Sequence, residues 1–180
     1  MKKSLIYFIL FSGVFVTLTF LSYLLVQQDL RMSANDPQIQ LAEDDARALS
    51  LGAVPASVVS RGKSINISES LAPFVIVYDN KGLALESEAK LHNSIPIPPK
   101  GVFDYTRTNG EDRITWQPED GVRMATVITR WQSGNSSGFV LAGRSIREVE
   151  NRAQNLLRIT LVVTLWLVGL SLILAIVLPK

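Results

Sequence analysis

Few residues in this sequence could do chemistry. His92 is the only histidine and there is no cysteine, so neither a multi-histidine nor a cysteine metal site can form. Asp44-Asp45 and Glu119-Asp120 are adjacent carboxylates, but neighbouring residues on a helix or turn do not face each other. The sequence contains no phosphate-binding loop and no nucleophile elbow. We therefore predict a protein that is not an enzyme, holds no metal and needs no cofactor.

Two long uncharged segments lie near the ends of the chain. Leu5–Val26 holds 22 residues and Ile159–Leu178 holds 20, with no charged side chain in either. A helix needs roughly 20 apolar residues to cross a bilayer. Lys2 and Lys3 could instead open a cleaved signal peptide, but the apolar run is long for one and no small-residue cleavage site follows it. We predict a first transmembrane helix within 1–26 and a second, with a short tail, within 159–180.

The middle region, 27–158, is almost neutral. It holds 15 of the 18 lysines and arginines and all 16 aspartates and glutamates, a balance of 15 − 16 = −1. Such a region has no electrostatic footprint for nucleic acid. The terminal lysines favour termini on the cytoplasmic side. Arginines that flank the spans on the domain side would favour the opposite orientation, but long connecting regions translocate largely regardless of charge. We expect a two-span protein of the cytoplasmic (inner) membrane, with both termini cytoplasmic and the middle domain extracytoplasmic.

The middle region begins with a helix. Apolar residues recur three and four apart over Pro37–Leu51, which places them on one helical face. Asn35 or Asp36 is the expected N-terminal cap, and Gly52 the left-handed end. The residues of the predicted apolar face are Ile39, Ala42, Ala46 and Leu49.

Five strands are expected after this helix. Runs of β-branched and aromatic residues are separated by turn signals such as Asn80-Lys81-Gly82. Ala53–Leu71 is predicted to be loop with a short helix near Ser68, and the prolines of Ser94–Gly101 exclude regular helix or central strand there. Several strands are apolar on both faces, so the helix must cover one face and the proline-rich segment the other. The predicted strands are Phe74–Asp79, Leu83–Glu86, Arg113–Gln117, Val122–Trp131 and Phe139–Gly143.

The chain ends in one long helix. Ser145 and Glu148 form a capping box, and no proline or glycine interrupts the chain from there to Gly169. Ile146–Leu178 is therefore predicted to be a single rod of about 50 Å. Apolar residues recur three and four apart along this helix and form a stripe. The stripe is either the seam of a homodimer or a surface that packs on the chain's own sheet or first helix. The residues assigned to this helix are Ser145, Ile146, Glu148, Val149, Ala153 and Leu156.

The order of these segments carries a family resemblance. The segments are FVIVYDNKG at Phe74–Gly82, ITWQP at Ile114–Pro118, GVRMATVITRW at Gly121–Trp131 and GFVLAGRSIREVE at Gly138–Glu150. Together they resemble the extracytoplasmic PAS-like (PDC or Cache-type) sensor domain of bacterial two-span signalling proteins, especially sensor histidine kinases. The likeness covers nearly all of the first 178 residues.

The resemblance implies an α+β fold. Two transmembrane helices would flank a PAS-like five-stranded antiparallel sheet with an N-terminal helix, and a long C-terminal helix would be continuous with the second span. In the family, a cytoplasmic output domain follows that span, whereas this sequence stops at Pro179-Lys180. The chain is therefore expected to be a sensor module without its transmitter.

The resemblance also implies a ligand site between the sheet and the irregular segment over it. An arginine within an apolar strand needs an anionic partner, because burying it unpaired is costly. That partner is either a ligand carboxylate or one of Asp79, Glu86 and Asp104, with the structural ion pair favoured; for Trp116, core packing is favoured over a pocket wall. The candidate ligand-binding residues are Tyr105, Arg107, Trp116, Arg123 and Arg130.

These features favour a membrane-anchored sensory or accessory protein, which transmits an external cue to a separate signalling protein such as a histidine kinase. The expected partners are the membrane, a small-molecule ligand, a two-component kinase and a second copy of the chain, but no nucleic acid. Two alternatives remain: a non-sensing membrane-anchored scaffold, and a truncated sensor-kinase remnant.

Overall fold

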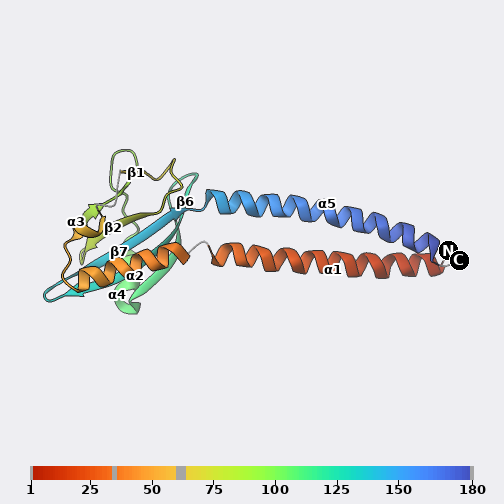
Figure 1. Cartoon of the computed structure of the whole chain (residues 1–180), viewed down its shortest axis with the longest axis horizontal. Helices are drawn as coiled ribbons and strands as arrows, with labels where there is room; N and C mark the ends of the chain where they lie inside the picture. The colour runs from red at the N-terminus through yellow and green to blue at the C-terminus, as the bar shows by residue number, and fades with distance from the viewer. Residues whose placement is uncertain (1, 34–35, 60–63, 179–180) are drawn as a thin grey trace. The chain divides into compact units, whose positions relative to one another are not determined.

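The computed structural model describes residues 2–33, 36–59 and 64–178, and the chain divides into two units. The first unit consists of α1 (Lys2–Met32) and of α5 (Arg147–Val177) from Val149 onward, drawn in red and blue in Figure 1. The second unit is a folded domain over Ser33–Glu148. Asn35, predicted as a helix cap, and Pro179-Lys180 lie outside the described residues.

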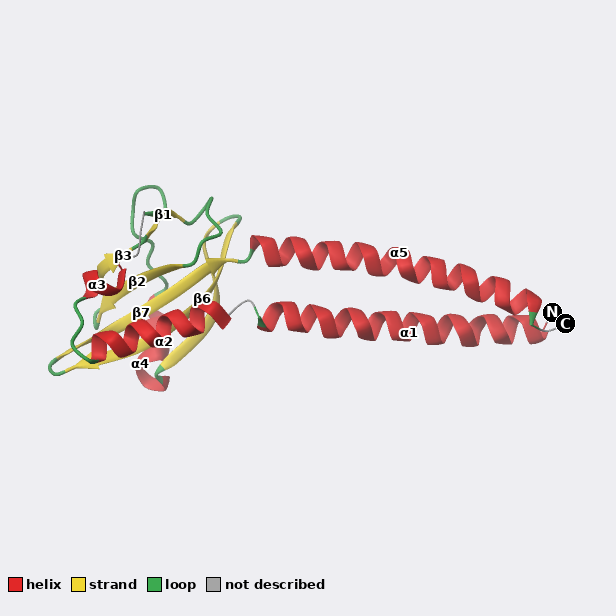
Figure 2. Ribbon diagram, viewed as in Figure 1, coloured by secondary structure: helices red, strands yellow, loops and turns green. Residues whose placement is uncertain are grey.

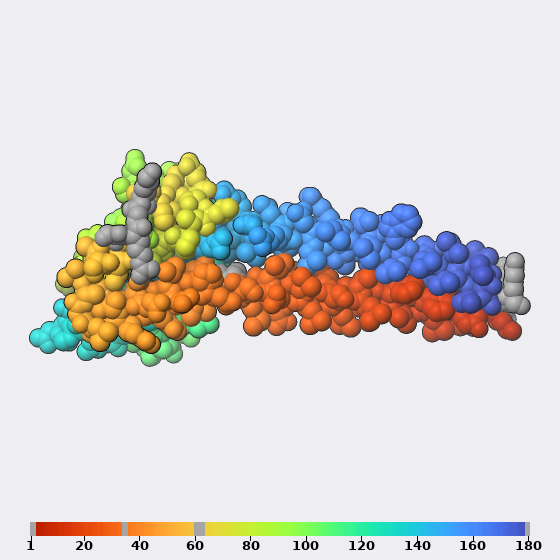
Figure 3. Space-filling view, in the orientation of Figure 1, coloured from red at the N-terminus to blue at the C-terminus, as the bar shows by residue number. Residues whose placement is uncertain are grey.

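The two long helices are apolar over most of their length. Each has 31 residues, or about 46 Å at 1.5 Å per residue, and each contains a window long and apolar enough to cross a membrane. The predicted rod Ile146–Leu178 differs from α5 by one residue at each end. The two helices lie side by side in the space-filling view (Figure 3), and the buried residues of α5 are Ser171 and Ala175, near its C-terminal end.

The domain contains the predicted five-stranded antiparallel sheet. Its strand order is β3-β2-β7-β6-β5, and each predicted strand overlaps an observed one. β6 and β7 extend beyond the prediction, because pairing continues from Met124↔Ser145 to Ser133↔Ser136 across a turn that holds Gly134 at positive φ. The strands are β2 (Phe74–Asp79), β3 (Ala84–Ser87), β5 (Glu111–Glu119), β6 (Val122–Ser133) and β7 (Ser136–Ser145).

Helix α2 (Asp36–Ser50) covers one face of this sheet, as Figure 2 shows. The prediction Pro37–Leu51 is confirmed to within one residue, and Gly52 has φ +100° at the helix end. Two of the contact residues are alanines, which let the helix backbone lie close to the sheet. The buried residues of this layer are Ala42, Ala46 and Leu49 of α2, Val58 and Val59, and, from the sheet, Val75, Val77, Val127, Trp131, Val140 and Ala142.

The opposite face is covered by α4 (Lys100–Asn109), by the loop that carries Ile67 and by the proline-rich segment. Phe103 of α4 packs edge-on against Tyr78 and at a tilt against Phe139, with both centroid distances 5.1 Å. The Tyr78 hydroxyl donates a hydrogen bond of 2.8 Å to the carbonyl oxygen of Pro96. Both faces of the sheet are therefore covered, as its apolar pattern predicted.

Four elements were not predicted: α3 (Pro55–Val59), β1 (Ile65–Asn66), β4 (Ala89–Lys90) and α4. The prediction of a short helix near Ser68 is wrong, because the short helix of that region is α3 and Ser68 lies in a turn. Its amide and hydroxyl both donate to the Asn66 side chain, a local bond that competes with helix formation.

Candidate functional site

The link between the sheet and the long C-terminal helix is a single residue. β7 ends at Ser145 and α5 begins at Arg147, so only Ile146 separates a strand inside the sheet from the long helix. The Ile146 amide donates to the carbonyl oxygen of Arg123 (3.1 Å). The Ser145 hydroxyl accepts the Arg147 amide (3.3 Å), so Ser145 caps the first turn through the amide two residues on.

Two arginines fasten this junction to the loop that follows β1. Arg144 Nε donates to the carbonyl oxygen of Leu71 (3.1 Å), and Arg147 Nη2 donates to that of Glu69 (2.7 Å). The loop is itself ordered, because the amides of Glu69 and Ser70 donate to the carbonyl oxygen of Asn66. Arg147, in the first turn of α5, is therefore hydrogen-bonded to an ordered loop.

The loop is also tied to the core of the domain. Ile67 has 2% of its surface exposed and belongs to the layer that contains Tyr78, Phe103 and Phe139. Its amide donates to the carbonyl oxygen of Lys90, beside the parallel pair β1–β4. Ile67 lies two positions before Glu69 and four before Leu71, the two residues whose carbonyl oxygens accept from the arginines. We define the junction site as Glu69, Leu71, Arg144, Ser145, Ile146 and Arg147.

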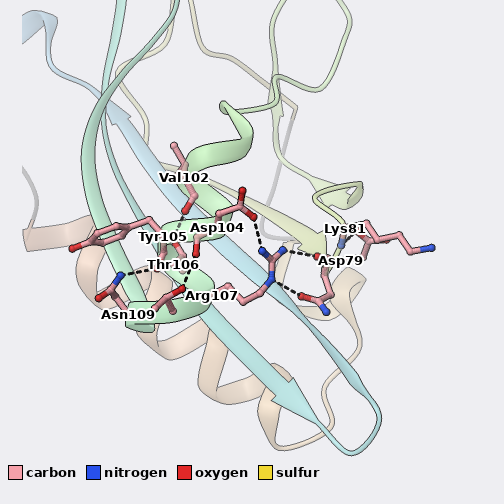
Figure 4. A network of polar contacts seen from close by, with 10 residues as sticks. Asp79, Lys81, Val102, Asp104, Tyr105, Thr106, Arg107 and Asn109 are labelled. Atoms are coloured by element: carbon pink, nitrogen blue, oxygen red, sulfur yellow. Dashed lines mark hydrogen bonds and ion pairs between the residues drawn. The ribbon is translucent and has the colours of Figure 1, made fainter.

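A second polar cluster joins α4 to the β2–β3 turn (Figure 4). Arg107 Nη1 donates to Asp104 Oδ1 (2.6 Å), Nη2 to the carbonyl oxygen of Asn80 (3.0 Å) and Nε to Asn80 Oδ1 (3.4 Å). Its guanidinium also lies 5.5 Å from the centroid of the Phe139 ring. The partner of Arg107 is thus Asp104, one of the three carboxylates considered from the sequence.

The turn beneath this cluster is closely packed. Asp79 Oδ1 accepts the amides of Lys81 and Leu83, both at 2.8 Å. Gly82 has φ +82°, and a Cβ there would lie 3.0 Å from the Phe103 ring. Arg107, Phe103 and the turn therefore hold α4 on the sheet.

The five candidate ligand residues do not gather at one place. Tyr105 and Arg107 share α4, where Tyr105 is 54% exposed, and Trp116 is buried in the core layer. Arg123 and Arg130 are exposed on β6. Seven residues separate these two arginines in a strand of regular register, so their side chains point to opposite faces of the sheet.

The chemistry-bearing residues of the sequence are also apart from the junction site. His92 Nε2 lies 2.6 Å from Glu119 Oε2, and the His92 side chain is 75% exposed. His92 and Asn93 both have positive φ in a tight turn closed by Leu91 and Ser94. Among the residues that the structure describes, no three histidine, aspartate or glutamate side chains are grouped so that they could hold a metal ion.

Of the residues assigned to the C-terminal helix, Glu148, Val149, Ala153 and Leu156 lie in α5, whereas Ser145 is the last residue of β7. Ile146 is the link residue and not part of α5. Val149, Ala153 and Leu156 are partly buried on α5. The sequence carried no signal for Glu69 and Leu71, because both take part through backbone carbonyl oxygens, which every residue has.

Comparisons with protein-family models, with curated proteins and with solved structures found no match to this chain.

Proposed function

We propose that this chain is a membrane-anchored sensory or accessory protein. Its domain binds an external cue or partner, and α5 transmits the change to a separate signalling protein, such as a histidine kinase. The junction site carries this proposal: Arg144 and Arg147 bind the loop at Glu69–Leu71, and Ile146 alone links β7 to α5. A domain that served only as a spacer would not need its membrane helix bound to a distant loop.

The proposal includes a location and an orientation. Both long helices span the cytoplasmic membrane, both termini are cytoplasmic, and the domain is extracytoplasmic. The basic residues Lys2, Lys3 and Lys180 support this orientation. Reporter fusions at Lys180 and within the domain test it, since they must be active on opposite sides of the membrane.

A PAS-like sensor domain is the family assignment that we propose. The sheet supports it: the first strand of the sheet, β2, lies beside the last, β7, and the remaining strands flank this central pair. Helices and an irregular segment cover both faces of this sheet. The ligand site remains part of the proposal, although the five candidate residues are distributed over α4, β5 and β6.

The experiment that tests the function uses the tagged full-length chain, captured from native membranes after mild crosslinking. Co-purification of a kinase supports sensing, whereas co-purification of a cell-wall or secretion complex supports the scaffold alternative. Ala153→Pro breaks the α5 rod above the membrane, and Ala153→Ser is its matched control. We expect Ala153→Pro to abolish regulation of the partner while the domain stays folded; unchanged regulation would refute transmission through the rod.

A further inference from the structure

Two hydroxyl pairs join α1 and α5 inside their apolar segments. Ser12 Oγ lies 2.6 Å from Ser171 Oγ, and Thr164 Oγ1 lies 3.0 Å from Thr19 Oγ1. Ser171 has no exposed surface. Hydrogen bonds between polar side chains are a recognised means of joining helices in a membrane, where no hydrophobic force acts between helices. We call these two pairs the hydroxyl ladder.

The ladder sets one register of an antiparallel pair. Seven residues separate Ser12 from Thr19, and seven separate Thr164 from Ser171, so both pairs belong to the same alignment of two helices. Seven residues are about two turns, or about 10 Å. In this alignment Phe8 lies level with Ala175, a large residue opposite a small one that is 1% exposed.

Each hydroxyl of α5 also has an acceptor within its own helix. Thr164 Oγ1 lies 2.7 Å from the carbonyl oxygen of Thr160, and Ser171 Oγ lies 2.6 Å from that of Val168. Thr19 Oγ1 likewise lies 2.9 Å from the carbonyl oxygen of Phe15. Thr19, Thr164 and Ser171 therefore keep an acceptor within their own helices when the pairs separate.

A second alignment is available one turn away. If α5 moves by four residues toward its own C-terminal end, Thr160 replaces Thr164 opposite Thr19. Ser12 then lies level with Leu167, and Ala175 with Ser4, so one hydroxyl pair is kept and the other is lost. A one-turn displacement of about 6 Å in the opposite direction places Val168 opposite Thr19 and Ala175 opposite Ser12, and keeps neither pair.

We propose that α1 and α5 form a two-position device, held in its resting register by the hydroxyl ladder and able to move one turn in one direction only. The Ser12–Ser171 pair decides between the positions, because it exists in the resting register alone. That this movement carries the signal rests on the proposed function. The existence of the two registers is independent of the proposed function.

The chain contains no cysteine, so disulfide crosslinking of introduced pairs can report the register of the full-length protein in membrane vesicles. One cysteine replaces Ala175. Its partner is Phe8→Cys, level with it in the resting register, or Ser4→Cys, level with it in the second. All three positions lie near the membrane ends of the helices, and neither reporter pair alters the ladder.

The expected result is that the 8–175 crosslink predominates. Ser12→Ala removes the deciding pair and should raise the ratio of 4–175 to 8–175 by about 3-fold, and at most about 20-fold, on the measured range for such bonds. Ser22→Ala is the matched control, because its hydroxyl bonds only to Leu18 of its own helix among the described contacts. Thr19→Ala weakens both registers and should leave the ratio nearly unchanged.

Three outcomes would overturn the proposal. The resting register is wrong if 8–175 does not form. The second register is wrong if 4–175 does not form even with Ser12→Ala, and the ladder is not its determinant if Ser12→Ala and Ser22→Ala give equal ratios. None of these measurements needs a cue or a partner, so their failure is distinct from failure of the proposed function, which the capture experiment tests.

Discussion

Arg147 Nη2 donates a 2.7 Å hydrogen bond to the carbonyl oxygen of Glu69, across 78 residues of sequence. Arg144 Nε donates a similar hydrogen bond to the carbonyl oxygen of Leu71, two residues further along the same loop. The contact joins the first turn of a helix long enough to cross a membrane to the edge of the domain core.

The first prediction concerns the junction loop. The double substitution Arg144→Ala and Arg147→Ala removes both fastenings, so the amides of Glu69 and Ser70 should exchange with deuterium faster. Because the bonds are exposed, we expect at most about 1 kcal/mol of lost domain stability. Arg113→Ala is the control, since Arg113 pairs with Glu111 of its own strand. Equal exchange in the two variants would show that the arginines do not hold the loop.

The second prediction concerns Gly138, in β7. A Cβ there would lie 2.0 Å from the carbonyl oxygen of Tyr78 and 2.9 Å from Trp131 Nε1. Because the closest atom belongs to the backbone of the paired strand, Gly138→Ala should destabilise the domain by about 3 kcal/mol or more, measured by urea unfolding with tryptophan fluorescence.

Gly101→Ala is the matched control for that substitution. Gly101 lies in α4 with open space at its Cβ position, so alanine should be neutral or stabilise the helix by up to about 1 kcal/mol. A similar loss of stability in both variants would mean that close strand packing is not the reason for glycine at 138.

The third prediction concerns alkaline pH. Burial raises the pKa of the Tyr78 phenol far above its ordinary value of about 10. The unfolded chain releases this proton above about pH 10 while the folded domain retains it, so this contribution to stability is complete below pH 10 and is lost as pH rises further. The loss should approach about 1.4 kcal/mol per pH unit.

Tyr78→Phe should remove this pH dependence. At neutral pH it also loses the hydrogen bond to Pro96, worth about 1 kcal/mol. Urea midpoints at pH 8 and pH 11 measure both effects, and Tyr105→Phe, at an exposed tyrosine, should retain the wild-type dependence. An equal loss above pH 10 in the Tyr78 variant would contradict the assignment.

The fourth prediction concerns the aromatic layer. Phe103 is 4% exposed and touches both Tyr78 and Phe139, so Phe103→Ala should cost about 3–5 kcal/mol. Tyr105→Ala, two residues along the same helix but exposed, should change stability by less than about 0.5 kcal/mol. Similar losses from both substitutions would mean that α4 does not contribute to the core through Phe103.

Much of the domain could be predicted because its pattern is local. Helix α2 shows its apolar face at spacings of three and four, and the β2–β3 hairpin is marked by Asn80-Lys81-Gly82 between two short runs. Helix α4 could not be predicted from the sequence. It begins just after Pro99 and contains Gly101, three β-branched residues and few strong helix formers. Its stability depends on burying Phe103, a tertiary contact.

The features of the candidate site likewise fall into those that the sequence predicted and those that only the structure revealed. The sequence by itself determined two apolar segments able to span a membrane, a near-neutral domain between them and a helix starting at the Ser145 cap, because charge, hydropathy and capping are properties of neighbouring residues. Only the tertiary structure decided that Arg147 meets Glu69 and that Ser12 meets Ser171. Those contacts join residues 78 and 159 positions apart, and one of them uses a backbone carbonyl oxygen, which leaves no mark in the pattern of side chains.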